Sequence, residues 1–315
     1  MKARRLMLAA AAWLCFGHGL PAVRAQEANE GTLRVCLNEN LPPYSVRHGD
    51  TGSGFDLLIS EALAKRLGRR LAVQWFESKL DEASNSTVEA DALLSDGRCE
   101  LVAGYPLVKD ALGKPEAESA RLPDFAGSRP GDRRRRVALG TLVATTPYHF
   151  APLTVVLGGK AAPKRIGSLA DLDDVSLGIE SGTLGDGILM TFDHGRFIPN
   201  ITHMIPERGE LLPGLENGEY DATIMPLHHF DAYRIDHPNT KLTASGYYLK
   251  IGFNMGFVGL AEEAVLIEQA NQAIENMLKD GEASSLARLA HMTYVPPRRP
   301  YILEHLSLGD LAKDQ

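Results

Sequence analysis

The chain of 315 residues has a formal net charge of −7, with 44% hydrophobic and 23% charged residues. These values are typical of a globular protein of about two domains. The acidic balance argues against nucleic-acid binding, and beyond the N-terminal segment no apolar run reaches the ~20 residues of a membrane-spanning helix.

The first 25 residues have the pattern of a secretory signal peptide. Three basic residues come before the apolar run Leu6–Phe16, and Val-Arg-Ala at 23–25 offers small residues for cleavage. We therefore predict that residues 1–25 are removed and that the protein is periplasmic; an N-terminal membrane anchor is the alternative. Loss of the four basic residues of this segment takes the net charge from −7 to −11.

Residues 32–68 predict a buried strand, a polar loop and an amphipathic helix. Strand Leu33–Leu37 is mostly apolar, as expected for a parallel strand covered on both faces. The apolar residues with helical spacing are Phe55, Leu58, Ile59, Ala62 and Leu63, and Gly68 suits a left-handed helix end. Open α/β sheets bind ligands beyond the carboxyl ends of their strands, so we predict Asn38, Glu39 and Tyr44 as ligand contacts.

Further strand and helix patterns follow along the chain. We predict strands at 70–76, 99–103, 151–157, 175–179, 220–225 and 247–258, and helices at 87–94, 207–218, 264–279 and 284–291. Residues 110–136 are polar and rich in proline and glycine, which predicts a long loop.

A strand, a glycine turn and a helix start follow one another at 175–184. A helix N-terminus in this position points free N–H groups at an anion, so we predict Gly182, Thr183 and Leu184 as ligand contacts. Ordinary N-capping by Thr183 fits the same pattern. The nearby polar set His228, His229, Asp231 and His237 matches no strong zinc spacing, and we expect no metal and no cofactor.

Several motifs, in this order, resemble the periplasmic solute-binding proteins of family 3, the amino-acid-type receptors of ABC transporters. They are P-P-Y at 42–44, G-S-G-F-D at 52–56, A-K-R-L-G at 64–68, T-T-P-Y at 145–148, I-G-S-L-A-D-L at 166–172 and N-G-E-Y-D-A-T-I-M at 217–225. The resemblance implies an α/β, two-lobed periplasmic binding protein fold of type II, with two crossing segments and a ligand cleft between the lobes.

The resemblance also implies domain boundaries and two more contacts. Lobe 1 would comprise 31–150 and 252–295, lobe 2 would comprise 157–246, and 296–315 would be a C-terminal tail that packs along the surface or stays mobile. In the family the strand end near Gly104 and Tyr105 contributes to the ligand site. Tyr105 fits a packed aromatic equally well.

Two departures from the family pattern concern the ligand. The family's carboxylate-clamping arginine lies about nine residues before P-Y, where this chain has Ala138, although the run Arg133–Arg136 is close. The aspartate that receives an ammonium in the family falls at Pro226, which we retain as a cavity position. We therefore predict a ligand other than an ordinary α-amino acid.

The chain beyond residue 25 contains two cysteines, Cys36 and Cys99. In an exported protein such a pair predicts a disulfide, and in the implied fold their strands are neighbours. Two buried free thiols are the alternative. The absence of C-x-x-C argues against a redox role.

The motifs L-R-V-C, G-R-C-E-L-V-A-G-Y-P and T-T-P-Y are also similar to binding proteins associated with quinoprotein dehydrogenases. We therefore keep three hypotheses. The first is a monomeric, non-enzymatic receptor that delivers a small polar solute to an ABC permease. The second is an accessory protein of a periplasmic quinoprotein alcohol dehydrogenase. The third is a dehydratase-type enzyme, with Glu39 or Glu180 as acid or base.

Overall fold

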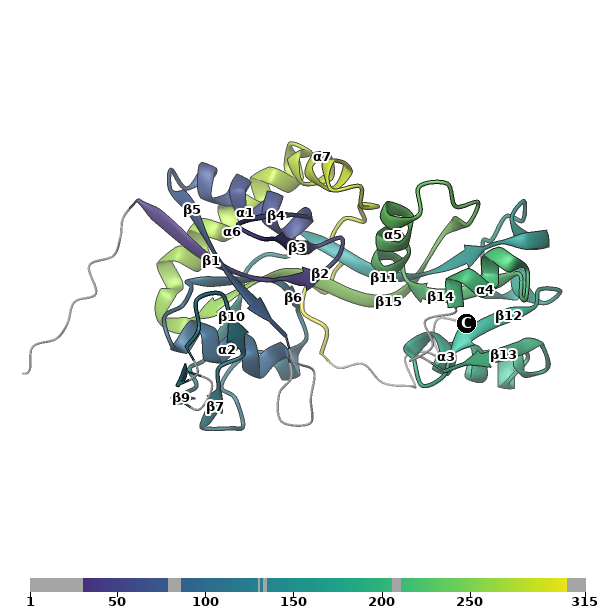
Figure 1. Cartoon of the computed structure of the whole chain (residues 1–315), viewed down its shortest axis with the longest axis horizontal. Helices are drawn as coiled ribbons and strands as arrows, with labels where there is room; N and C mark the ends of the chain where they lie inside the picture. The colour runs from purple at the N-terminus through teal and green to yellow at the C-terminus, as the bar shows by residue number, and fades with distance from the viewer. Residues whose placement is uncertain (1–30, 79–85, 130, 133–134, 206–210, 305–315) are drawn as a thin grey trace, which may run out of the picture. The chain divides into compact units, whose positions relative to one another are not determined.

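The computed structural model describes residues 31–78, 86–129, 131–132, 135–205 and 211–304 (Figure 1). The predicted signal peptide lies outside the described residues. Within them, no helix has both the length and the apolar character needed to cross a membrane.

A ten-stranded mixed sheet forms the framework of the molecule. Its strands, in spatial order, are β13 (Ile201–Met204), β12 (Leu177–Glu180), β14 (Ala222–Pro226), β11 (His149–Leu157), β15 (Thr243–Leu260), β6 (Leu101–Pro106), β1 (Thr32–Asn38), β5 (Arg70–Glu77) and β8 (Asp124–Phe125), and β10 (Leu142–Ala144) pairs with β15. β5, β1 and β6 are parallel, and so are β13, β12 and β14. The antiparallel pair β11–β15 joins these two parallel sections.

Helices cover both faces of the section around β1. They are α1 (Phe55–Arg66), α2 (Ser86–Ser95), α6 (Ala264–Lys279) and α7 (Glu282–Leu289). Leu33, Val35 and Leu37 of β1 pack into the same core cluster as α1, α6 and α7, whereas Cys36 packs with α2 on the opposite face (Figure 1). This alternation explains why four of the five residues of Leu33–Leu37 are apolar. Gly68, with φ of 68°, follows the C-terminus of α1 as predicted.

The section around β12 has its own cores. Its helices are α3 (Leu184–Thr191), α4 (Leu211–Asn217) and α5 (Leu227–Asp236). One cluster joins β11, β12, β14 and α3, and another centres on α4, with Leu215 and Tyr220 fully buried. The helix predicted at 207–218 begins at 211 in the described chain, and α5 is a helix that the sequence analysis did not predict.

The prediction of a long loop at 110–136 is wrong in part. β8 extends the main sheet beside β5, and β7 (Ser119–Arg121) pairs with β9 (Arg136–Ala138) in a separate two-stranded sheet. Ala120, Leu122 and Phe125 are buried in the same cluster as α2. These few apolar residues bind the segment to the core, although the segment as a whole is polar and rich in proline and glycine. A further small sheet comprises β2 (Asn40–Leu41), β3 (Ser45–His48) and β4 (Thr51–Ser53).

The C-terminal tail packs against the sheet as far as it is described. The Asn254 side chain donates to the carbonyl oxygen of Arg298 at 2.7 Å and accepts from its N–H at 2.9 Å. The Leu303 N–H donates to Leu107 O, and the Lys109 N–H donates to Leu303 O. Residues 296–304 therefore pack along the surface, which is one of the two outcomes predicted for the tail. Residues 305–315 lie outside the described chain.

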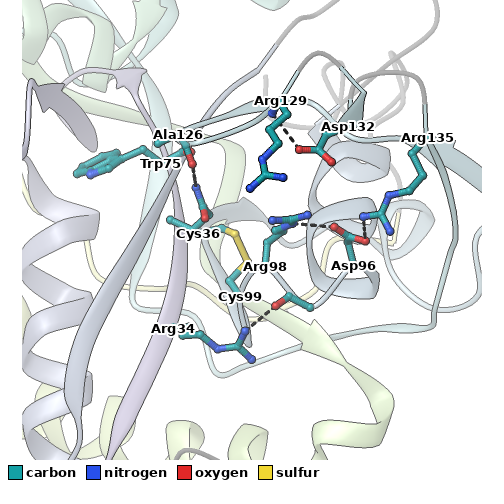
Figure 2. A network of polar contacts seen from close by, with 12 residues as sticks. Arg34, Cys36, Trp75, Asp96, Arg98, Cys99, Ala126, Arg129, Asp132 and Arg135 are labelled. Atoms are coloured by element: carbon teal, nitrogen blue, oxygen red, sulfur yellow. Dashed lines mark hydrogen bonds and ion pairs between the residues drawn. A yellow bond between two sulfur atoms is a disulfide. The ribbon is translucent and has the colours of Figure 1, made fainter. Parts of the chain in front are cut away.

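The predicted disulfide is present and links β1 to the segment that enters β6. Cys36 and Cys99 are joined with a Cα–Cα distance of 5.6 Å (Figure 2). Both residues are buried. Next to the bridge, the Asp96 carboxylate pairs with Arg98 and Arg135. The bridge therefore holds two parallel strands in register beneath a polar surface network.

Replacing both cysteines by alanine should destabilise the protein substantially. The bridge closes a 63-residue loop, and the chain-entropy model gives about 4 kcal/mol of stabilisation for a loop of this length. Urea denaturation of the double variant and the wild type measures the difference, with wild-type protein in reductant as a second comparison. Equal free energies of unfolding, or free thiols at both positions by mass spectrometry of exported protein, would contradict the prediction.

Candidate ligand-binding site

A cavity of about 970 Å³ lies at the carboxyl ends of parallel strands from both sections of the sheet. β1 and β6 contribute from one section and β12 and β14 from the other, while Ala151 of β11 and Phe253 of β15 form part of its wall. This is the position where open α/β sheets bind ligands, and the volume is at the upper end of the range of small-molecule sites.

Most of the predicted contact residues line this cavity. Those that do are Asn38, Glu39, Tyr44, Gly104, Thr183, Leu184 and Pro226. Tyr105 and Gly182 do not. A register shift in the pairing of β6 with β15 interrupts the strand alternation, and Tyr105 is buried with Val102 in the cluster of α2, where its hydroxyl donates to Ala111 O at 2.7 Å. Tyr105 is therefore a packed aromatic residue, which was the alternative to a ligand contact in the sequence analysis.

The predicted anion site at the start of α3 is already occupied by the chain itself. Thr183 is the N-cap, and its hydroxyl oxygen accepts from Asp186 N at 3.2 Å. The Asp186 carboxylate in turn accepts from Gly182 N at 2.9 Å. This carboxylate accepts a hydrogen bond from the N–H group of the glycine turn. Its negative charge lies close to the positive end of the helix dipole and partly neutralises it. The N-capping alternative for Thr183 is thus present.

Three sequence motifs meet beside the cavity in a chain of hydrogen bonds. Tyr148 donates its hydroxyl proton to Asp56 Oδ1 at 2.7 Å, and the same hydroxyl accepts from Gly104 N at 2.7 Å. Gly104 has φ of 68°, and a Cβ there would collide with Asp56 Oδ2. Only glycine fits without strain, because the positive φ and the close carboxylate act together. The network fixes the strand end that the ligand would approach.

Burial changes the proton affinity of this network. The Asp56 carboxyl is fully buried, which raises its pKa from 3.8 to about 7, while the hydrogen bond from Tyr148 acts in the opposite direction. Burial also raises the pKa of Tyr148 well above its ordinary value, with Asp56 as the second cause. Asp56 can therefore exchange a proton near neutral pH, although its carboxyl group is shielded from solvent.

Histidines that the sequence analysis did not predict as contacts lie beside Tyr44. The ring of Tyr44 is 5.0 Å from that of His228 and 5.9 Å from that of His149, measured between centroids. His228 and His229 begin α5 and line the cavity. Burial lowers the pKa of His228 and of His149 to about 3. The signal available in the sequence was the position of His228 and His229 just after Pro226, at the end of a predicted strand.

The charged side chains among the described residues of the cavity wall are all acidic. Glu39, Glu77 and Glu180 contribute carboxylates, and of the residues that the structure describes no lysine or arginine lines the cavity. Glu39 pairs with Arg47 at 3.2 Å. The two described arginines of the run at 133–136 bind elsewhere, since Arg135 pairs with Asp96 and Arg136 donates to Ser119.

The polar side chains of α5 contact other protein groups. Within the described parts of the chain, no group of three or more histidine, cysteine, aspartate or glutamate side chains could hold a metal ion. His228 and His229 contact each other edge-on, while Asp231 accepts from Thr293 and Arg234. These contacts assign the polar residues 228–231 to packing and to the cavity wall.

Solved structures with the same architecture define the class of fold. The chain has the two-lobed α/β fold of the substrate-binding proteins of amino-acid ABC transporters. The sequence itself matches no family model, and no curated protein is similar to it in sequence.

Three particular structures illustrate the likeness. The L-cystine solute receptor of Neisseria gonorrhoeae, in an unliganded open conformation, has 16% identity and a TM-score of 0.59 over 86% of this chain and 97% of that chain. Substrate-binding domain 2 of GlnP from Lactococcus lactis, also open, has 17% identity and a TM-score of 0.57 over 82% and 95%. An ancestral cyclohexadienyl dehydratase has 19% identity and a TM-score of 0.54 over 83% and 93%. The fold thus occurs in receptors and in an enzyme.

Gly104→Ala should destabilise the protein more than an alanine substitution at a comparable glycine. Gly97 is the matched control, because it has φ of 70° but no atom within 4 Å of the position that a Cβ would take. The left-handed conformation alone costs about 1–2 kcal/mol for a residue with a Cβ, and the collision with Asp56 adds to this only at Gly104. Urea denaturation of both variants tests the difference; equal losses would contradict it.

Stability should depend on pH through Asp56. Its pKa is about 7 in the folded protein and 3.8 ordinarily, so between these values the folded state holds a proton that the unfolded state has released. The free energy of unfolding then falls as pH rises from 4 to 7, by up to about 1.4 kcal/mol per pH unit, and this contribution is constant above pH 7.

Asp56→Asn should remove this part of the slope, because asparagine keeps an acceptor for Tyr148 but does not titrate. Denaturation of wild type and variant at several pH values between 4 and 8 measures the difference between their stabilities. A difference that does not change with pH would show that Asp56 is ionised throughout this range.

Proposed function

We propose that this protein is a periplasmic solute-binding protein, which captures a small solute by closure of two lobes and delivers it to an ABC transporter. The observation that carries the proposal is the 970 Å³ cavity at the strand ends of both parallel sections. A ligand in such a cavity contacts both sections at once, so it favours the conformation in which they are closest.

The route of the chain between the sections supports a hinge. β11 and β15 run antiparallel from one parallel section to the other, and their pairing shifts register after Pro152. Irregular pairing at this point lets the two strands bend together. The separate core clusters on either side support the lobe boundaries proposed from the sequence, 31–150 with 252–295 and 157–246.

Export to the periplasm has two supports. The first is the signal-peptide pattern of residues 1–25. The second is the Cys36–Cys99 bridge, because structural disulfides persist in oxidising compartments. The two are independent, since one concerns targeting and the other the chemistry of the folded chain.

The accessory protein of a quinoprotein dehydrogenase is the second candidate function. The cysteine placement that suggested it is realised as a disulfide, and the cavity wall lacks the arginine clamp of amino-acid receptors among its described residues. An enzyme is less well supported. Glu39 is paired with Arg47, and among the described residues Glu180 contacts no second acid or base that would complete a catalytic pair.

A screen of small solutes by thermal shift tests the receptor function. At least one solute should raise the melting temperature of the mature chain, because ligand at 100 times its Kd stabilises by about 2.7 kcal/mol. Small-angle X-ray scattering should then report a more compact protein with the same solute.

Substitutions at two alanines provide the control. Ala151→Phe places a ring in the cavity and should abolish the shift, whereas Ala264→Phe lies at an exposed position of α6 and should leave it unchanged. If no solute stabilises the protein while a periplasmic quinoprotein dehydrogenase binds it, the accessory function replaces the receptor function.

A further inference from the structure

The charge distribution around the cavity is unsuited to a carboxylate ligand. Of the three lining carboxylates, only Glu39 has an ion-pair partner in the described chain; Glu77 and Glu180 have none. No described lining residue carries a fixed positive charge. A carboxylate placed here would lose part of its hydration and meet negative charge from one exposed and two half-buried carboxylates, which is unfavourable without a positive partner.

Two sources of positive potential among the described residues, the start of α3 and the histidines of α5, are weakened. The N-terminus of α3 faces its own Asp186 carboxylate, which accepts from Gly182 N. His228 and His229 are buried, and desolvation lowers the pKa of both imidazoles, so they are neutral at pH 7. Neutral imidazoles offer hydrogen bonds to a ligand, but no charge that could balance an anion.

Two lining residues carry unpartnered polar atoms that are buried just beneath the surface of this wall. The Tyr44 hydroxyl and His228 Nδ1 are buried and have no hydrogen-bond partner among the described residues. Such atoms are rare in folded proteins and call for a partner that the protein chain does not supply. Both the phenolic oxygen and the unprotonated nitrogen of an imidazole can accept a hydrogen bond from an ammonium group.

Most of the remaining wall is apolar, although Asn38, Asn40 and Thr183 are among its other lining residues. The apolar side chains include Leu153, Leu184, Ile224, Met225, Phe253 and Met255. Aromatic faces attract organic cations, and thioethers and aliphatic groups cover an apolar body. The wall therefore combines acceptors and negative charge with a surface for hydrocarbon.

We propose that the cavity takes an organic amine with an apolar body and no carboxylate group. This inference rests on the proposed solute-binding function and narrows its ligand class. Glu77 and Glu180 attract the ammonium group, the neutral polar groups of Tyr44 and His228 accept its N–H bonds, and the apolar wall covers the remainder of the molecule.

Pairs of amines and their parent amino acids test the proposal by isothermal titration calorimetry. The probes are phenethylamine with L-phenylalanine, tryptamine with L-tryptophan, and isoamylamine with L-leucine; 3-phenylpropionate tests the carboxylate alone. At least one amine should bind ten-fold or more tightly than its parent amino acid, and 3-phenylpropionate should not bind.

The outcomes separate this inference from the function on which it rests. Tighter binding of any amino acid than of its amine, or binding of 3-phenylpropionate, overturns the inference but leaves a solute receptor. The same holds if all three amines fail while another solute in the thermal-shift screen binds. If no solute of any class binds, the proposed function itself fails.

Removal of the cavity carboxylates provides an independent test. Glu180→Gln and Glu77→Gln should each weaken binding of the preferred amine by five- to ten-fold, and the double variant should weaken it further. Glu275→Gln removes a carboxylate from the exposed face of α6 and should leave the affinity unchanged. Unchanged affinity in the double variant, with an unchanged melting temperature, would overturn the role of these two residues.

Discussion

The hydrogen-bond chain from Asp56 through Tyr148 to Gly104 is the constraint on which the cavity depends. It joins the first turn of α1, the residue before β11 and the end of β6, three segments that are far apart in the sequence. The Asp56 and Tyr148 side chains are buried, so each must find its partner inside the protein. Phe55 and Phe257 pack against the Tyr148 ring and hold the hydroxyl in place. The motifs G-S-G-F-D and T-T-P-Y, which first suggested the fold, are therefore parts of one structural unit beside the cavity.

The sequence was sufficient for those parts whose pattern is local. The apolar run of β1 predicts a strand that is buried on both faces, and the apolar spacing of α1 predicts a helix. The disulfide follows from the two cysteines together with the oxidising compartment that the N-terminal segment predicts. The side on which Tyr105 lies could not be predicted, because a register shift within β6 interrupts the strand alternation. The role of Asp186 was harder to predict, because an aspartate in the first turn of a helix is equally consistent with an open anion site. The strands within 110–136 depend on three buried apolar residues in a segment of loop-like composition. Whether His228 faces solvent or Tyr44 is decided by tertiary packing alone.

The two departures from the amino-acid receptor pattern, the missing arginine and the missing aspartate, both concern the wall of the cavity. Without an arginine among the described lining residues, a ligand carboxylate has no clamp. With Pro226 at the end of β14, the family's ammonium-binding aspartate is absent from that position as well. Negative charge is nevertheless present, but it comes from the ends of β1, β5 and β12 at Glu39, Glu77 and Glu180. The fold has thus kept the place of the cavity and changed the chemistry of its wall, as expected when function belongs to a site and the fold is shared.

The position of the histidines would link ligand contact to the proposed hinge. His228 lies on α5 directly after β14, whereas Tyr44 belongs to the turn between β2 and β3 and His149 begins β11. Asp231, one turn further along α5, accepts from the N–H and hydroxyl of Thr293. α5 therefore contacts segments from the beginning, the middle and the end of the described chain. A ligand that hydrogen-bonds His228 acts on a helix that is tied to each of them, so its binding free energy can bias the relative positions of these segments. Neutral imidazoles suit this role. Two positively charged histidine rings so close together would repel each other, and this repulsion would favour the open arrangement at all times.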